Sequence, residues 1–327
     1  MTGRPLSTRA AALTLALAAL LAVAACGGGD DDSDGPGETI IHTPIDSDIL
    51  PIIVSSDLAI GDNRFVVGLI EQESGEQVIG GDLHLAFYLM DTNDGTLKFE
   101  RDPEPIIVTK SYTHTHPDGV IETHEAGTVG AYVTHADFDE AGLWGVEVTG
   151  STAEGTDLEP IRPTFSVLEK SFGLNIGDPA PRSVQTLLSD VADIKEIDTS
   201  QDPIPQQHNM TIADAVTSGR PTVIAIATPA FCESQVCGPT KDYFDDLYNE
   251  RKDDANFVHV EPYDLACING PDFETLYDCR NPILDEWRLQ SEPWVFIVDA
   301  DGNIAAKLDG LVTLEEMEAA LDDALEA

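Results

Sequence analysis

The sequence predicts a chain of two folded parts, an all-β sandwich over residues 39–170 and an α/β part over residues 175–327. In the first part, short runs of strand composition are separated by Gly, Asn, Asp and Pro, as is typical of all-β domains. In the second part, helical patterns alternate with short β-branched runs, as is typical of α/β folds. Each part is long enough to bury a hydrophobic core of its own.

Residues 1–26 are a predicted lipoprotein signal peptide. Arg4 and Arg9 precede an almost wholly apolar run at 10–25, which is short for a membrane span. The junction Val23-Ala24-Ala25-Cys26 resembles a bacterial lipobox, which implies that Cys26 is lipidated and anchors an extracytoplasmic protein to the cell membrane. The alternative is an ordinary signal peptide in which Cys26 is incidental. Residues 27–38 hold Gly and acidic residues without large apolar side chains, so we predict a flexible acidic tether.

The β part contains seven runs of strand composition, and the last of them alternates apolar and polar side chains. Turn sequences such as Asn93-Asp94-Gly95 and Pro117-Asp118-Gly119 separate the runs. This number of strands in a part of this length indicates an immunoglobulin-like sandwich without its disulfide. The runs are residues 50–54, 64–70, 83–89, 105–110, 128–135, 143–149 and 161–167.

Four histidines of the β part, His114, His116, His124 and His135, lie close together in the sequence. On a strand, His114 and His116 would project to one face, and imidazole clusters suit copper or zinc. The competing interpretation is that these residues are polar surface around the predicted loop at Pro117-Asp118-Gly119. We favour it, and we therefore expect no metal.

The α/β part is predicted to contain a buried strand at 222–228, because this run is apolar, continuous and rich in β-branched residues. We expect it to lie in a parallel sheet with both faces covered. Pro239 is expected to open the next helix, and Thr313 with Glu316 forms the capping box of the last one. The remaining predicted elements are a helix at 210–217, a strand at 257–263, a helix led by Asn281-Pro282, and a hairpin of 294–299 with 303–308.

Two cysteines, Cys232 and Cys237, follow the buried strand with four residues between them. Open α/β sheets place their chemistry at the carboxyl ends of strands, and a helix N-terminus favours the thiolate form of cysteine. On a regular helix, Cα atoms five residues apart are roughly 8–9 Å apart, whereas a disulfide spans about 4.4–6.8 Å. Either this segment is a loop or oxidation unwinds a turn. The pair is a redox-site hypothesis, and its alternative is a static disulfide that clamps a loop.

Cys267 and Cys279 are the other cysteines of the C-terminal half. The four cysteines Cys232, Cys237, Cys267 and Cys279 allow three pairings, and the two local pairings require the least rearrangement of the chain. We therefore predict a structural disulfide between Cys267 and Cys279.

Two segments carry a family resemblance. Gly177-Asp178-Pro179-Ala180-Pro181 resembles the opening segment of extracytoplasmic thioredoxin-like and peroxiredoxin-like proteins, and 292–302 resembles their cis-proline strand and hairpin. The chain is thus similar to bacterial lipoproteins that join an immunoglobulin-like domain to a thioredoxin-like domain. The resemblance implies that Pro293 is a cis-proline that shapes a substrate groove. The usual Cys-x-x-Cys of thioredoxins is replaced by a Cys-x4-Cys spacing, which also occurs in one-helix peroxiredoxins.

The leading functional hypothesis is a membrane-tethered thiol–disulfide oxidoreductase that uses Cys232 as nucleophile and Cys237 as resolving cysteine, without a cofactor. Its expected partners are protein thiols or disulfides, or an upstream redox protein. The alternatives are a thiol peroxidase and a non-catalytic lipoprotein that binds a partner or a metal. The chain has 60 acidic and 17 basic residues, a balance that argues against nucleic acid as a partner.

Overall fold

The computed structural model describes residues 47–115, 121–231, 236–270 and 273–326, and for residues 109–115 and 121–126 it describes the backbone without side chains. The predicted signal peptide, Cys26 and the tether lie outside this part of the chain. The strands are β1 (Ile49–Ile53), β2 (Gly61–Glu71), β3 (Gly81–Leu89), β4 (Thr96–Arg101), β5 (Glu104–Thr115), β6 (Ile121–Phe138), β7 (Gly142–Thr152), β8 (Thr164–Val167), β9 (Thr222–Ile226), β10 (Asn256–Val260), β11 (Trp294–Val298) and β12 (Ile304–Asp309). The α-helices are α1 (Ile212–Ala215), α2 (Cys237–Arg251), α3 (Leu265–Ile268), α4 (Ile283–Glu286) and α5 (Leu314–Glu326), and the 3-10 helices are η1 (Leu188–Asp190), η2 (Ile194–Glu196), η3 (Pro205–His208) and η4 (Leu276–Cys279).

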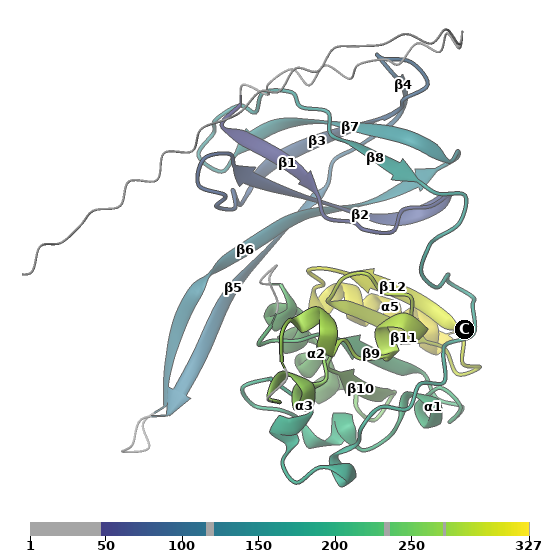
Figure 1. Cartoon of the computed structure of the whole chain (residues 1–327). Helices are drawn as coiled ribbons and strands as arrows, with labels where there is room; N and C mark the ends of the chain where they lie inside the picture. Colours follow the sequence, from purple (N-terminus) through teal and green to yellow (C-terminus); the bar gives the residue numbers. More distant parts are fainter. Residues whose placement is uncertain (1–46, 116–120, 232–235, 271–272, 327) are drawn as a thin grey trace, which may run out of the picture. The chain divides into compact units, whose positions relative to one another are not determined.

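The first eight strands form two antiparallel sheets, with the orders β1-β2-β6-β5 and β4-β3-β7-β8, packed as a sandwich (Figure 1). Apolar side chains from both sheets share one core, because alternate residues of each strand point inward. The centre of this core is aromatic. The ring centroid of Phe138 lies 4.9 Å from that of Trp144 and 6.0 Å from that of Phe87, and all three side chains are fully buried.

All seven predicted strand runs overlap observed strands, but the structure adds β4 and lengthens β5 and β6. The strand β4 is half exposed and mostly polar, with Phe99 stacked on Phe87 as its main apolar contact, so it gives a weak sequence pattern. The strands β5 and β6 pair from Glu104↔Val133 to Thr115↔Ile121 and form a long hairpin (Figure 1).

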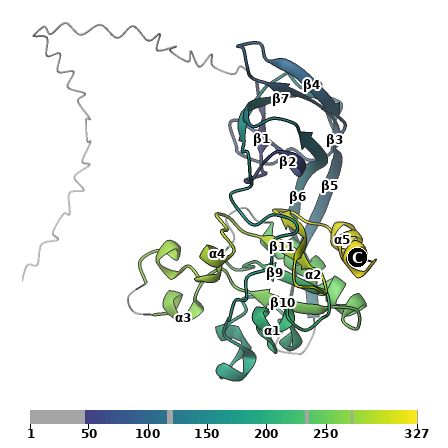
Figure 2. The ribbon, with the colours of Figure 1, turned by 90° about the vertical axis from the view of Figure 1, so that its right-hand side faces the viewer.

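The third sheet has the order β10-β9-β11-β12 and carries the candidate site at one end of β9 and β10. The strand β10 runs parallel to β9, whereas β11 and β12 are antiparallel to their neighbours. Both faces are covered. Residues of α2 and α5 such as Phe244 and Leu321 pack on one face, and residues of α1 and α4 such as Ile212 and Leu284 pack on the other. In Figure 2, α4 and α5 accordingly lie on opposite sides of the sheet.

The fold class predicted from the sequence is wrong as it was stated. In the described residues, twelve strands in three antiparallel or mixed sheets accompany five α-helices, and α1, α3 and α4 have four residues each. The chain is therefore β-rich and mostly sandwich-like, and the structure does not show the thioredoxin-like α/β fold predicted for residues 175–327. The physical reason is that a continuous apolar run such as β9 indicates a strand buried on both faces. It does not indicate whether the strands that pair with it run parallel or antiparallel.

Residues from Ile45 to Ala327 form one compact unit. The prediction of separately folding parts at 39–170 and 175–327 stays a prediction. No helix in the described ranges combines the length and the apolar character that crossing a membrane requires.

Candidate active site

The helix α2 begins at Cys237, two residues before the predicted start at Pro239. Cys237 is fully buried and disulfide-bonded. Its position in the first turn places it where the N–H groups and dipole of the helix act on a side chain. Cys232, the other residue of the predicted pair, lies in the segment 232–235, outside the described residues.

Pro293 follows a cis peptide bond, which confirms the predicted isomer. It is buried, and it directly precedes Trp294, which pairs with Ile226 near the end of β9. The carbonyl oxygen of Pro293 accepts a hydrogen bond from the backbone N–H of Gly310 at 3.0 Å, so this oxygen already has a partner within the chain. The substrate-groove role of Pro293 stays a prediction.

Tyr263 connects the proline segment with the end of the cysteine-bearing loop. Its hydroxyl donates to Glu292 Oε1 at 2.9 Å, and its ring meets the edge of Phe231, with 6.3 Å between the centroids. Phe231 directly precedes Cys232 in the sequence.

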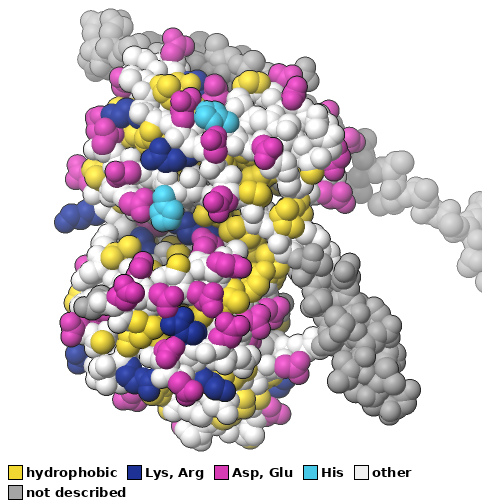
Figure 3. Space-filling model, turned by 180° about the vertical axis from the view of Figure 1, so that it is seen from behind, with side chains coloured by type: hydrophobic (Ala, Val, Ile, Leu, Met, Phe, Trp, Pro, Cys, Tyr) yellow, Lys and Arg dark blue, Asp and Glu magenta, His cyan; other side chains and the backbone are white. Residues whose placement is uncertain are grey.

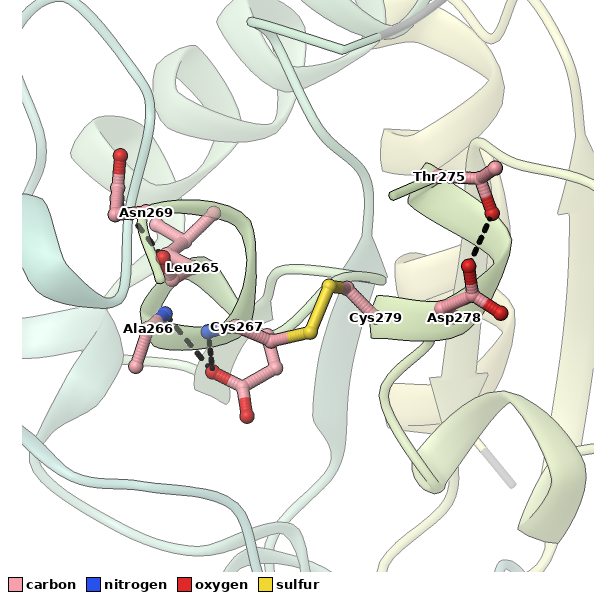
Figure 4. Close-up of a disulfide and its surroundings, with 8 residues drawn as sticks. Leu265, Ala266, Cys267, Asn269, Thr275, Asp278 and Cys279 are labelled. Atoms are coloured by element: carbon pink, nitrogen blue, oxygen red, sulfur yellow. Dashed lines mark hydrogen bonds between the residues drawn. A yellow bond between two sulfur atoms is a disulfide. The ribbon is translucent and has the colours of Figure 1, made fainter. Parts of the chain in front are cut away.

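The predicted pairing of Cys267 with Cys279 is confirmed, with 5.6 Å between the Cα atoms. The bridge joins α3 to η4 (Figure 4). Asp264 caps α3 by accepting hydrogen bonds from the backbone N–H groups of Ala266 at 2.9 Å and Cys267 at 3.2 Å. A short cross-linked loop of this kind fits the predicted structural role.

Among the residues that the structure describes, the histidines of the β part do not form a group that could hold a metal ion. His135 is exposed and contacts Asp62 Oδ2 through Nδ1 at 2.9 Å. It lies on the same strand as His124 but eleven residues further on, a separation on the order of 35 Å along an extended strand. The structure therefore does not bring His135 together with His124. The side chains of His114 and His124, and the whole of His116, lie outside the described residues.

A different cluster is buried beside β10, and the sequence reasoning missed it. His208 Nε2 lies 2.8 Å from Asp198 Oδ2, and His259 Nδ1 lies 3.2 Å from the same oxygen. The exposed fractions of Asp198, His208 and His259 are 0%, 2% and 0%. Among the described residues, this is the group of potential metal ligands whose ligand atoms all lie within 4.8 Å of one another.

Three separate segments bring these side chains together. Asp198 lies in the loop between η2 and η3, and its Oδ1 accepts the backbone N–H of Ser200 at 2.7 Å. His208 is the last residue of η3. His259 lies on β10, on the same face as Phe257, because strand side chains alternate. Phe257 packs against α2, so His259 also points toward the α2 layer.

The protonation states of this cluster are set by burial and by its own hydrogen bonds. Burial alone would raise the pKa of Asp198, but the hydrogen bonds with His208 and His259 and the charge of Lys241 outweigh burial and hold that pKa well below its ordinary range. Burial lowers the pKa of His208, and the charges of His259 and Lys241 act in the same direction. The cluster thus favours an ionised Asp198 beside a neutral His208.

A buried lysine lies one helical turn after Cys237. Lys241 is 1% exposed, and its Nζ contacts both carboxylate oxygens of Asp245 at 2.7 Å. Gln207 Nε2 donates to the same carboxylate at 2.6 Å. Residues four apart on a helix share a face, so Lys241 and Cys237 lie on the same side of α2.

Glu261 is a second buried acid at this end of the sheet, 4% exposed. Its Oε1 accepts hydrogen bonds from the backbone N–H of Thr199 at 2.7 Å and from the Thr199 hydroxyl at 2.6 Å. Its Oε2 has no hydrogen-bond partner among the described residues. Burial raises the pKa of Glu261, and the interactions with His259 and Thr199 offset only part of this effect. Thr199 also accepts the backbone N–H of Ala230 at 3.2 Å, which connects Glu261 to the loop before Cys232.

A cavity of about 320 Å³ adjoins this cluster. His208, His259 and Glu261 line it, together with the acidic residues Glu196, Asp264 and Glu286. Two imidazoles and the buried acid Glu261 therefore border a space that small molecules or ions can enter.

Sequence reasoning missed Asp198, His208, Lys241 and Glu261 because they are far apart in the chain and form no local motif. One signal was present: His259 and Glu261 stand within or directly after an apolar run of strand length, where buried polar residues require partners. That signal marks the strand but does not identify the partners.

We predict that Glu261→Gln stabilises the chain at pH 7 by on the order of 1 kcal/mol and leaves stability unchanged near pH 4. A carboxyl whose pKa is higher in the folded than in the unfolded chain stays protonated in the folded chain at pH values where it is already ionised in the unfolded chain. Stability is therefore lost as pH rises from about 4.3 through the folded pKa. Glutamine mimics the protonated carboxyl and does not ionise, so the variant does not lose stability as pH rises through this range.

Urea unfolding of the full-length chain from pH 4 to pH 8 measures the effect. Glu159→Gln, at an exposed position, is the matched control and is expected to be neutral throughout. A Glu261→Gln variant that is less stable than the wild type at pH 7, or a difference that does not depend on pH, would show that Glu261 is ionised and well solvated.

Comparisons with known proteins identify no family for this site. No family model matches the chain, and no curated protein matches it.

Proposed function

We propose that this chain is a thiol–disulfide oxidoreductase, tethered to the outer side of a cell membrane by a lipid on Cys26. The observation that carries the proposal is the position of Cys237, a buried, disulfide-bonded cysteine in the first turn of α2. Helix N-termini and nearby cations favour the thiolate, which is the form of cysteine that exchanges disulfides. Lys241, one turn further along α2, supplies a buried cation on the same helix face.

The reaction follows from the two cysteine roles. The Cys232 thiolate attacks one sulfur of a substrate disulfide, a mixed disulfide forms, and the other substrate sulfur leaves as a thiolate. The Cys237 thiolate then attacks the Cys232 sulfur and releases the second substrate thiolate. The substrate gains two electrons, and Cys232 and Cys237 are oxidised to a disulfide. A dithiol protein that donates two electrons is required to reduce the pair again.

Glu261 supports the proposal because burial raises the pKa of this acid, and buried acids with a raised pKa are typical proton-transfer groups of active sites. Through Thr199 it is connected to Ala230, two residues before Cys232. The excess of acidic side chains, which are spread over the face drawn in Figure 3, is compatible with a protein partner and unfavourable for nucleic acid.

We expect the full-length chain to catalyse insulin reduction by dithiothreitol. Cys232→Ser should abolish this activity because it removes the nucleophile, whereas Cys237→Ser should accumulate mixed disulfides because nothing resolves them. Cys267→Ser combined with Cys279→Ser is the control, and activity should persist if the variant folds.

A peroxide-consumption assay on the same proteins distinguishes the alternatives. Rapid peroxide turnover without insulin reduction would indicate a thiol peroxidase. Activity in neither assay, with a Cys237 disulfide that resists dithiothreitol, would contradict the oxidoreductase proposal and favour a structural clamp.

The lipid anchor predicts a second outcome. In a bacterial host, Cys26→Ser should abolish membrane partitioning of the chain, because the serine hydroxyl cannot replace the thiol in lipidation. Fractionation and mass spectrometry of the mature N-terminus measure this, with Cys267→Ser as a control for cysteine loss elsewhere. A Cys26→Ser chain that remains membrane-bound with the same N-terminus would overturn the anchor.

A further inference from the structure

We propose that Asp198, His208 and His259 form a binding site for one divalent first-row transition-metal ion, with zinc as the reference ion. This inference does not depend on the thiol chemistry proposed above. It rests on the geometry of the three side chains, on the hydrogen bond made by the second nitrogen of His259, on the local charge and on the adjacent cavity.

The donor atoms already converge. Asp198 Oδ2 lies 2.8 Å from His208 Nε2 and 3.2 Å from His259 Nδ1. With metal–ligand bonds of about 2.05 Å, such separations correspond to ligand–metal–ligand angles of roughly 85° and 100°. The first angle is close to the ideal octahedral value, and the second lies between the octahedral and tetrahedral values. All three donor atoms lie within 4.8 Å of one another, so an adjustment of the side chains would admit the ion. Two imidazoles and one carboxylate form a donor set that suits zinc and its neighbours.

The tautomer of His259 is the strongest single argument. Its Nε2 lies 3.0 Å from the carbonyl oxygen of Ala227, and since a carbonyl can only accept, Nε2 carries a hydrogen. The other ring nitrogen, Nδ1, faces the Asp198 carboxylate at 3.2 Å, so an ion held by Asp198 would lie within reach of Nδ1. A histidine that donates its other N–H to a backbone carbonyl is the usual outer-shell arrangement of a metal ligand.

The charge around the cluster also favours a cation. Lys241 acts on Asp198 electrostatically, and its Nζ also contacts both oxygens of Asp245 at 2.7 Å, so this lysine is shared between two acidic side chains. A divalent ion would add a second cation beside the fully buried Asp198 side chain.

The adjacent cavity offers an approach to the cluster. Its volume is about 320 Å³, and its lining includes two of the three proposed ligands, His208 and His259. Glu196, Asp264 and Glu286 line the same cavity and would attract a cation into it.

Zinc titration of the chelator-treated full-length chain tests the proposal. Because other histidines can also bind zinc, the reference protein replaces His42, His84, His114, His116, His124 and His135 with Gln. This six-histidine variant should still bind one equivalent of Zn²⁺ measured by calorimetry. Adding His208→Gln or Asp198→Asn to it should weaken binding at least about tenfold, since each removes a ligand.

The cobalt spectrum of the six-histidine variant provides a second measurement that requires no change in the cluster. Bound Co²⁺ should show ligand-field bands without a thiolate-to-cobalt charge-transfer band, even if the cluster variants fail to fold. No stoichiometric binding of Zn²⁺ or Co²⁺, a thiolate band, or equal affinity in folded His208→Gln would each overturn the site.

Discussion

The carboxylate of Asp198, buried between two imidazoles, is the interaction on which the candidate site depends. It is fully buried, and it joins the loop before η3, the end of η3 and the strand β10 through contacts of 2.8 and 3.2 Å. Removing one partner from a buried charged cluster of this kind typically costs about 3–5 kcal/mol. Such a cluster fixes the position of the loop on the sheet. Apolar contacts alone would specify this position less strictly.

The cluster also determines the environment of the cysteine helix. His259 points toward the α2 layer, and Lys241 brings a buried charge from α2 to the same region. Cys237 lies one turn before Lys241, and Glu261 connects through Thr199 to the loop that leads to Cys232. A thiol site here would therefore have a buried lysine on the cysteine helix and a buried acid connected to the loop that precedes Cys232.

Local sequence signals predicted the local features of this chain well. The Cys267–Cys279 bridge and the seven strand runs follow from residues close together in the sequence, and the cis bond before Pro293 follows from the resemblance of residues 292–302 to a cis-proline segment. Two other features could not be predicted in this way, because they depend on how distant segments pack. They are the direction of the strands beside β9 and the contacts of Asp198 with His208 and His259. The β4 strand was missed because its pattern is polar, and the fold class was wrong because burial does not encode strand direction.

The reduction potential of the Cys237 disulfide tests the central claim most directly. The full-length chain can be equilibrated in thiol–disulfide buffers of known potential, and the reduced fraction can be read by alkylation and peptide mass spectrometry. The Cys267–Cys279 bridge serves as an internal structural reference in the same sample. The account predicts a potential above about −300 mV for Cys237, in the range of exchangeable disulfides. A value below about −300 mV, equal to that of the reference bridge, would contradict it.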